Sequence, residues 1–177
     1  MKLVVLDRDG VINHDSSAYI KSPTEWRPLP GSLEAIARLR KGGWRVAVAT
    51  NQAGVGRGLF DMATLSAIHS RMTAAVAAAG GHLDAIFFCP HAPEMQCGCR
   101  KPRPGMLHEI ARRFAVEPTD MVMVGDSLRD LQAAQAAGAR PVLVLTGNGA
   151  DTLRAGSLPE GTTVRANLMA VARELAP

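Results

Sequence analysis

The chain of 177 residues carries a formal net charge of +4, and 47% of its residues are hydrophobic while 4% are aromatic. This composition excludes a disordered or fibrous chain and favours one α/β domain over residues 1–177, rich in aliphatic side chains. No apolar run approaches the ~20 residues of a membrane helix, and the early charges are unlike a secretion signal. We therefore expect a cytoplasmic protein that has no membrane partner.

Short apolar runs and helical patterns alternate along the chain. The runs do not alternate with polar residues, which is typical of strands covered on both faces; they are Leu3–Leu6, Val46–Ala49, Ala85–Phe88, Met121–Val124 and Val142–Leu145. Helical spacing of apolar residues predicts helices over 32–40, from about 61 to the glycines at 80 and 81, over 106–114 and over 127–137. The alternation predicts a doubly wound, Rossmann-like parallel sheet. Residues 10–30 fit neither pattern, so we expect a hairpin or a loop excursion there, and the segment after Gly147 gives no clear prediction.

Polar side chains follow four of the expected strands at the point where each strand ends. These segments are Asp7-Arg8-Asp9, Thr50-Asn51-Gln52, Cys89-Pro90-His91 and Gly125-Asp126-Ser127. Ligands of open α/β sheets bind outside the carboxyl ends of the strands. The sequence therefore predicts one site at this edge of the sheet.

Two of these segments contain the chemistry of a magnesium site. Asp7 and Asp9 are two residues apart in extended chain, so their carboxylates lean to the same side, and Asp126 from another strand adds a third. Oxygen ligands without nitrogen or sulfur favour Mg²⁺. The Thr50 hydroxyl and the Asn51 amide can donate to phosphate oxygens. Each piece alone is more common as a turn, a cap or a surface residue, so the set as a whole supports the prediction.

In order, the four motifs resemble those of the haloacid dehalogenase superfamily of phosphohydrolases. They are Asp7-Arg8-Asp9-Gly10-Val11-Ile12, Thr50-Asn51, Lys101-Pro102 and Gly125-Asp126-Ser127-Leu128-Arg129-Asp130. The resemblance implies that Asp7 is the nucleophile and Asp9 the general acid and base. It also implies that Thr50 and Lys101 hold the phosphate. Mg²⁺ would lie on the carboxylates of Asp7 and Asp126 and the main-chain carbonyl of Asp9, and Asp130 would order Lys101 or metal-bound water.

The three cysteines gather with one histidine in a single short segment. Cys89, His91, Cys97 and Cys99 supply three thiolates and an imidazole, a complete structural zinc set. The alternative is that Cys89 belongs to the core and His91 is exposed. A Zn²⁺ ion here would pre-order the backbone just before Arg100 and Lys101.

This cysteine loop narrows the resemblance to phosphatases of heptose 1,7-bisphosphate and of histidinol phosphate, both without a large cap domain. The segments Thr50–Gly58 and Arg100–Met106 are more similar to the first family. This implies a small phosphorylated sugar as substrate, in the synthesis of nucleotide-activated heptose for lipopolysaccharide or a surface glycan. The candidate substrate-binding residues are Asn51, Gln52, Arg57 and Arg100. The spacer before Cys97 is short, and Ser127 stands where the heptose enzymes often have lysine.

Other functions remain open at this point. Histidinol-phosphate phosphatase is the first alternative, and a polynucleotide phosphatase fits the positive charge but lacks a basic patch with interleaved aromatics, so we expect no nucleic-acid partner. A zinc-stabilised binding module without activity would not need the complete set of motifs. Nothing in the sequence demands an oligomer, so we expect a monomer. His14, His69, His82 and His108 have no predicted partner and are expected to be surface or core residues.

Overall fold

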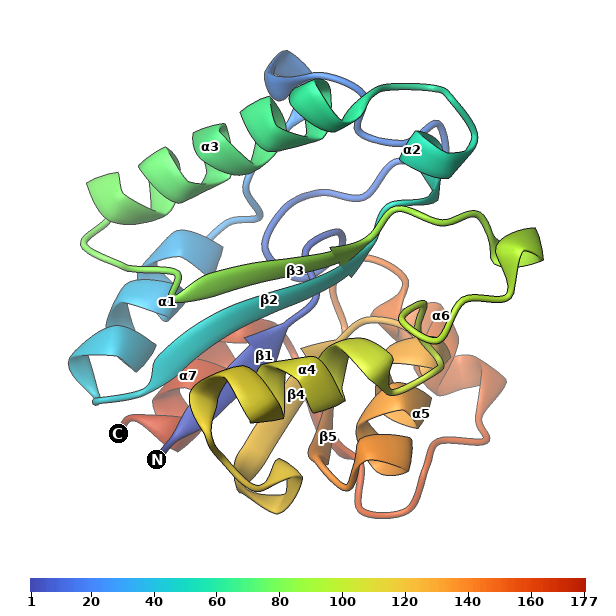
Figure 1. The fold of residues 1–177 in the computed structure, drawn as a ribbon. Helices are drawn as coiled ribbons and strands as arrows, with labels where there is room; N and C mark the ends of the chain where they lie inside the picture. Colours follow the sequence, from blue (N-terminus) through green and yellow to red (C-terminus); the bar gives the residue numbers. More distant parts are fainter.

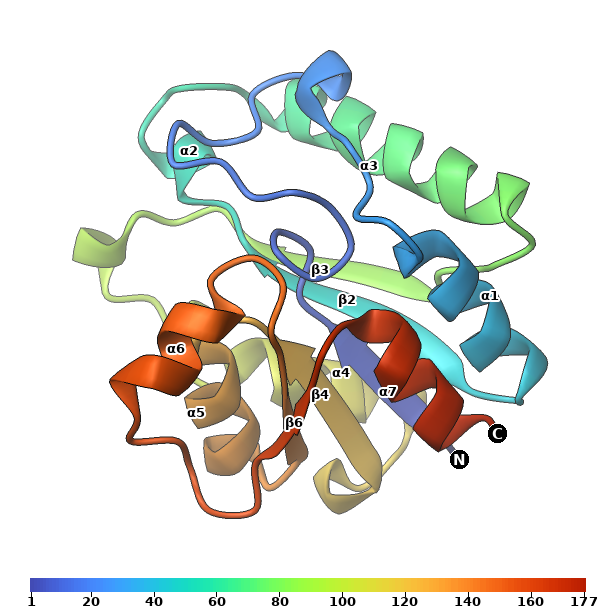
Figure 2. The same cartoon turned by 180° about the vertical axis from the view of Figure 1, so that it is seen from behind.

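A parallel sheet forms the centre of the computed structural model, which describes residues 1–177 (Figures 1 and 2). Its strand order is β3-β2-β1-β4-β5-β6. The strands are β1 (Leu3–Leu6), β2 (Arg45–Asn51), β3 (Ala85–Cys89), β4 (Met121–Gly125), β5 (Arg140–Val144) and β6 (Thr163–Arg165). The five predicted strands are thus confirmed, and the doubly wound parallel sheet with them.

Helices cover both faces of the sheet. On one face lie α1 (Ser32–Lys41), α3 (Met62–Ala78) and α7 (Leu168–Leu175), and on the other lie α4 (Gly105–Phe114) and α5 (Leu128–Ala137). The residues of strand β1 are all apolar because both of its faces are covered. Val4 and Leu6 belong to the core under α1, α3 and α7, whereas Leu3 and Val5 belong to the core under α4 and α5. Successive residues of a strand point to opposite faces, so a strand covered on both sides has no polar alternation.

The segment after Gly147, which gave no clear prediction, contains α6 (Gly149–Ala155), β6 and α7. Helix α7 packs on α1 beside the sheet, and side chains near α1 bind its last carbonyls. The Trp44 indole donates to the carbonyl of Leu175 at 3.0 Å, and Arg38 Nε donates to that of Ala176 at 2.7 Å. Helix α7 is only eight residues long and is fixed mainly by this packing.

Of the two forms predicted for residues 10–30, the structure has the loop excursion and no hairpin strands. Its regular parts are the single 3₁₀ turn Pro23–Glu25 and isolated bridges at Asn13, and the buried Ile20 and Trp26 anchor it in the core. A further short helix, α2 (Ala53–Gly56), follows β2 and was not predicted. None of the helices combines the length and the apolar character needed to cross a bilayer.

The topology determines where a ligand can bind. From β1 the chain crosses to β2 and β3 on one side, and later to β4, β5 and β6 on the other. The order therefore reverses between β1 and β4, which are direct neighbours. Asp7 follows β1 and Asp126 follows β4, so both stand at the switch point where ligands of such sheets bind.

Candidate active site

A buried lysine lies between two buried carboxylates at the end of β1. Lys101, in the loop before α4, places its Nζ 3.0 Å from Asp7 Oδ1 and 2.7 Å from Asp130 Oδ1, and donates to the carbonyl of Ala49 at 2.7 Å. Burial lowers the pKa of Lys101, but Asp130 and Asp7 outweigh it and raise that pKa above its usual value. The ammonium group is therefore charged and held against Asp7.

Three carboxylates converge on this lysine. Oxygens of Asp7, Asp126 and Asp130 lie within 4.8 Å of one another, and all three residues are buried. Burial, with Asp130 next, raises the pKa of Asp7 against the opposing effect of Lys101, and the same two causes raise the pKa of Asp126 to about 6. The single ammonium group is too little positive charge for three ionised carboxylates. A hard divalent cation such as Mg²⁺ fits this donor set.

Asp130 owes its place to the start of helix α5. Its Oδ2 accepts from the amide and the hydroxyl of Ser127, at 3.0 and 2.7 Å, and completes a capping box. Burial raises the pKa of Asp130, but Lys101 and these bonds outweigh it and lower that pKa. The same side chain therefore caps a helix and fixes the lysine.

Gly10 allows the Asp126 carboxylate to lie against the loop after β1. Its φ of +83° is in the left-handed region, and a Cβ at this position would overlap the Asp126 carboxylate. Asn148 donates to Asp126 Oδ2 from its main-chain and side-chain nitrogens, at 2.8 and 3.2 Å. The glycine after Asp9 is therefore required by the close approach of two strand ends.

The carboxylate of Asp9 lies apart from this group and accepts bonds from three side chains. Arg8 Nε donates at 3.0 Å, Asn13 Nδ2 at 2.9 Å and Gln52 Nε2 at 3.1 Å. Gln52 Nε2 also lies 2.9 Å from the Thr50 hydroxyl and donates to it. The end of β2 thus helps to fix the orientation of Asp9.

The cysteine cluster predicted from the sequence is assembled in the structure. Its Sγ and Nδ1 atoms are 3.3–3.5 Å apart for the five pairs within hydrogen-bonding range, and the ligands are Cys89, His91, Cys97 and Cys99. These spacings exceed a disulfide bond of about 2 Å and approach the edges of a tetrahedron around Zn²⁺ with bonds of about 2.0–2.3 Å. The four donors therefore fit a structural zinc ion.

Comparison with known proteins agrees with this geometry. Residues 98–171 match the family model described as "HAD-hyrolase-like". The D-glycero-β-D-manno-heptose-1,7-bisphosphate 7-phosphatase of Bordetella bronchiseptica is 61% identical over 99% of this chain and 98% of its own length, and that of Pseudomonas putida is 55% identical over 99% of each.

This chain belongs to the heptose 1,7-bisphosphate 7-phosphatase family of haloacid dehalogenase phosphatases. A crystal structure of the B. bronchiseptica enzyme, complexed with magnesium and phosphate, superimposes with a TM-score of 0.97 at 60% identity, covering 99% of this chain and 98% of that one. The Burkholderia thailandensis enzyme gives a TM-score of 0.79 at 57% identity, covering 98% and 97%. The predicted haloacid dehalogenase fold without a large cap is thereby confirmed.

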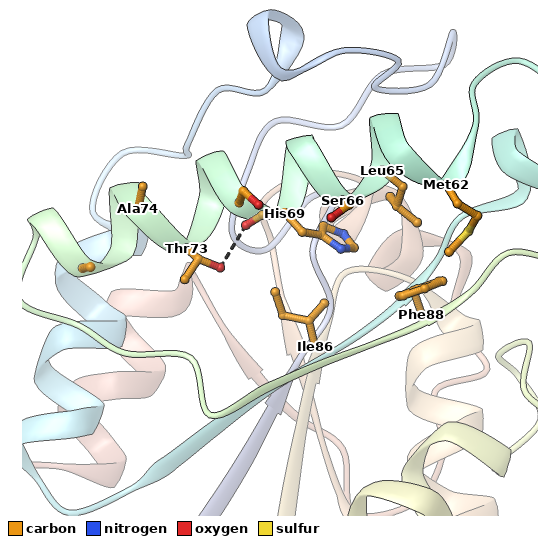
Figure 3. A pocket seen from close by; sticks show the side chains of 10 residues that line it. Met62, Leu65, Ser66, His69, Thr73, Ala74, Ile86 and Phe88 are labelled. Atoms are coloured by element: carbon orange, nitrogen blue, oxygen red, sulfur yellow. Dashed lines mark hydrogen bonds between the residues drawn. The ribbon is translucent and has the colours of Figure 1, made fainter.

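A cleft of about 250 Å³ opens over Asp7 and Asp9. Its walls are polar and carry several cations; the lining includes Asp7, Asp9, Asn51, Arg57, Arg100 and Arg129. A larger hollow of about 670 Å³ lies between α3 and β3, but apolar side chains such as Leu65, Ile86 and Phe88 line it (Figure 3). The polar cleft, and not the larger hollow, suits a phosphorylated sugar.

The structure places the remaining predicted residues around this cleft. The Asn51 side chain binds the main chain of Lys101, accepting from its N–H at 3.1 Å and donating to its carbonyl at 3.0 Å. Thr50 is buried beneath, with its hydroxyl bound to Gln52. Arg100 donates to the His91 carbonyl at 3.4 Å and so contacts the cysteine loop. The roles of these residues toward the substrate stay predictions.

Arg57 also lines the cleft and pairs loosely with the exposed Glu94, at 3.5 Å. The sequence reasoning missed further residues of the same walls, namely Asp15, Ser16, Ser17 and Arg129. Arg129 stands inside the fourth motif, and Asp15, Ser16 and Ser17 belong to the run of hydrogen-bonding side chains over 13–17, so the sequence contained a signal for both.

Proposed function

We propose that this chain is a magnesium-dependent phosphomonoesterase that removes the 7-phosphate of D-glycero-β-D-manno-heptose 1,7-bisphosphate. The observation that carries the proposal is the Asp7 carboxylate held 3.0 Å from the buried ammonium of Lys101, beside Asp126 and at the edge of a cleft that also contains Asp9. The substrate is that of the B. bronchiseptica and P. putida relatives as their names state it. The heptose 1-phosphate released would serve the synthesis of nucleotide-activated heptose.

In the first step Asp7 attacks phosphorus, and the bond between phosphorus and the sugar oxygen breaks. A carboxylate is a weak nucleophile, and Lys101 assists it by offsetting the charge of the approaching phosphate. Asp9 donates a proton to the departing sugar oxygen. The products are the free sugar hydroxyl and an aspartyl phosphate on Asp7.

In the second step water attacks the aspartyl phosphate, and Asp9 removes a proton from that water. Inorganic phosphate leaves, Asp7 is restored as a carboxylate and Asp9 is protonated again. Mg²⁺, held by Asp7, Asp126 and the Asp9 carbonyl, would supply further positive charge against the phosphate oxygens. The Asp130–Lys101 ion pair keeps the ammonium in place through both steps.

Selection of a bisphosphate follows from the cations around the cleft. The second phosphate of the sugar lies far from the one transferred, and Arg100 and Arg57 line the cleft that contains Asp7. A guanidinium group binds phosphate oxygens with two parallel bonds. A Zn²⁺ ion on the cysteine cluster would hold the main chain before Arg100 and Lys101 in one conformation. Histidinol phosphate has no second phosphate to use these groups, and the named relatives favour the heptose substrate.

Three measurements test the proposal. Asp7→Asn should abolish turnover and Asp9→Asn should slow it strongly, and mass spectrometry after trapping with beryllium fluoride or an aryl phosphate should place the adduct on Asp7. Steady-state rates should favour heptose 1,7-bisphosphate over histidinol phosphate. An Asp7→Asn enzyme of near wild-type rate would overturn the mechanism, and a preference for histidinol phosphate would overturn the substrate.

A further inference from the structure

The arginine between the two motif aspartates is completely buried. Arg8 has an exposed fraction of 0%. Its guanidinium donates two hydrogen bonds to the neighbouring Asp9 carboxylate, from Nε to Oδ1 at 3.0 Å and from Nη2 to Oδ2 at 3.2 Å. A fork of this kind fixes the direction of a carboxylate better than a single bond. Arg8 therefore sets the orientation of the residue to which we assign proton transfer.

The other end of the same guanidinium meets a histidine from a distant part of the chain. Arg8 Nη1 lies 3.2 Å from Nε2 of His69, 61 residues later, in the middle of helix α3. Arginine has no acceptor, so His69 Nε2 must accept this bond, and the ring proton must stay on Nδ1. Burial, with Arg8 next, lowers the pKa of His69 to about 4, so the ring is neutral near neutral pH.

The surroundings of His69 explain why its acceptor matters. The ring projects from α3 toward β3 in the middle of the apolar hollow, among Leu65, Ile86 and Phe88 (Figure 3). Its centroid is 6.0 Å from that of Phe88. Water has little access to Arg8, which is 0% exposed, so its Nη1 group depends on His69 for a partner.

We propose that His69 is a positioning residue for the reaction: its Nε2 holds Arg8, and Arg8 holds the Asp9 carboxylate where it can exchange a proton with the sugar oxygen. The inference deepens the proposed function and rests on the role of Asp9 given there. Without the acceptor, the Arg8 guanidinium turns toward other partners and the fork loosens. Proton transfer requires hydrogen-bond reach, so a small displacement of Asp9 costs rate.

The test uses the dependence of rate on the leaving group. A nitrophenolate departs without a proton, whereas an alkoxide needs one from Asp9. We would measure kcat/KM, which reports steps up to departure of the leaving group, for a series from nitrophenyl to alkyl phosphates. His69→Leu should lower kcat/KM about 10- to 100-fold for alkyl phosphates and less than about threefold for nitrophenyl phosphate. His69→Gln, whose Oε1 can replace Nε2, should restore most of the loss.

Matched variants separate the possible results. The compared quantity is the slope of log kcat/KM against the pKa of the leaving group. Ser66→Ala, one turn earlier on α3 and without a side-chain hydrogen bond, should keep the wild-type slope. In an Asp9→Asn background, which itself should show the steep slope, His69→Leu should add nothing. If His69→Leu fails to fold, His69→Met serves the same comparison at a longer, unbranched side chain.

An equal loss on every substrate, or an undiminished effect of His69→Leu in the Asp9→Asn background, would show that His69 serves only the fold and would overturn the inference. A wild-type slope for Asp9→Asn alone would instead overturn the assigned role of Asp9, and the inference with it.

Discussion

Replacing Asp126 by asparagine should stabilise the magnesium-free protein at alkaline pH while it removes the magnesium site. In the folded chain, burial and Asp130 raise the pKa of Asp126 from 3.8 to about 6. A folded state that holds its proton more tightly than the unfolded state loses stability as the pH rises. The loss starts near the unfolded pKa of 3.8 and is complete above the folded pKa of about 6.

The magnitude follows from this shift. About two pKa units correspond to about 3 kcal/mol at pH 8, and about half of that cost is already present at pH 5. Between pH 5 and pH 8 the wild type should therefore lose roughly 1.5 kcal/mol more stability than Asp126→Asn. The asparagine can still accept from Asn148 through its Oδ1, so this hydrogen bond does not confuse the comparison.

The assay is urea unfolding at both pH values after dialysis into magnesium-free buffer, which leaves tightly bound zinc in place. Adding Mg²⁺ at about 100 times its dissociation constant should stabilise the wild type by about 2.7 kcal/mol and the variant far less. The exposed Asp120, which has no ion pair, provides a control of equal charge change as Asp120→Asn. If Asp126→Asn destabilises equally at pH 5 and pH 8 without magnesium, the electrostatic reasoning is refuted.

Three other perturbations have defined outcomes. Elemental analysis after dialysis should find one zinc per chain, and Cys99→Ser should lose it, lower the thermal midpoint by roughly 10 °C and weaken activity through the loop that carries Lys101. Arg100→Ala should lower kcat/KM on the heptose bisphosphate by a factor that corresponds to about 2–4 kcal/mol of lost transition-state stabilisation. On an aryl phosphate the loss should be much smaller, and steady-state kinetics on both substrates measure it. Gly10→Ala should abolish measurable magnesium binding by titration calorimetry, since its Cβ would overlap the Asp126 carboxylate.

The first two predictions have outcomes that would contradict them, and the third has a control variant. Full activity in zinc-free protein would contradict the structural role of the cysteine cluster. An equal loss on both substrates would assign Arg100 to the transferred phosphate or to the fold. Gly43→Ala, also at a positive φ but with nothing within 4 Å of its Cβ, measures backbone strain alone and should leave magnesium binding intact.

The fold class can be predicted from the sequence alone, because strands buried on both faces consist of continuous apolar residues. Five continuous apolar runs with helical spacing between them allow little except a parallel sheet covered on both sides. The motifs after these strands also pointed to one edge and to its chemistry, since reactive carboxylates and thiolates have specific ligands. Helix α7 was not predicted from the sequence, because it is short and is held by contacts with α1 and Trp44.

The pairing of the charged residues, by contrast, depends on the tertiary structure. No pattern in the sequence connects Arg8 with His69, since the two are 61 residues apart and meet only where α3 crosses the loop after β1. The cleft walls at Asp15 and Arg129 likewise arise from loops whose paths no periodic pattern records. Periodicity reports which face of an element is buried, a local property. The partner of a buried charge depends on the packing of whole elements, which single-sequence patterns do not contain.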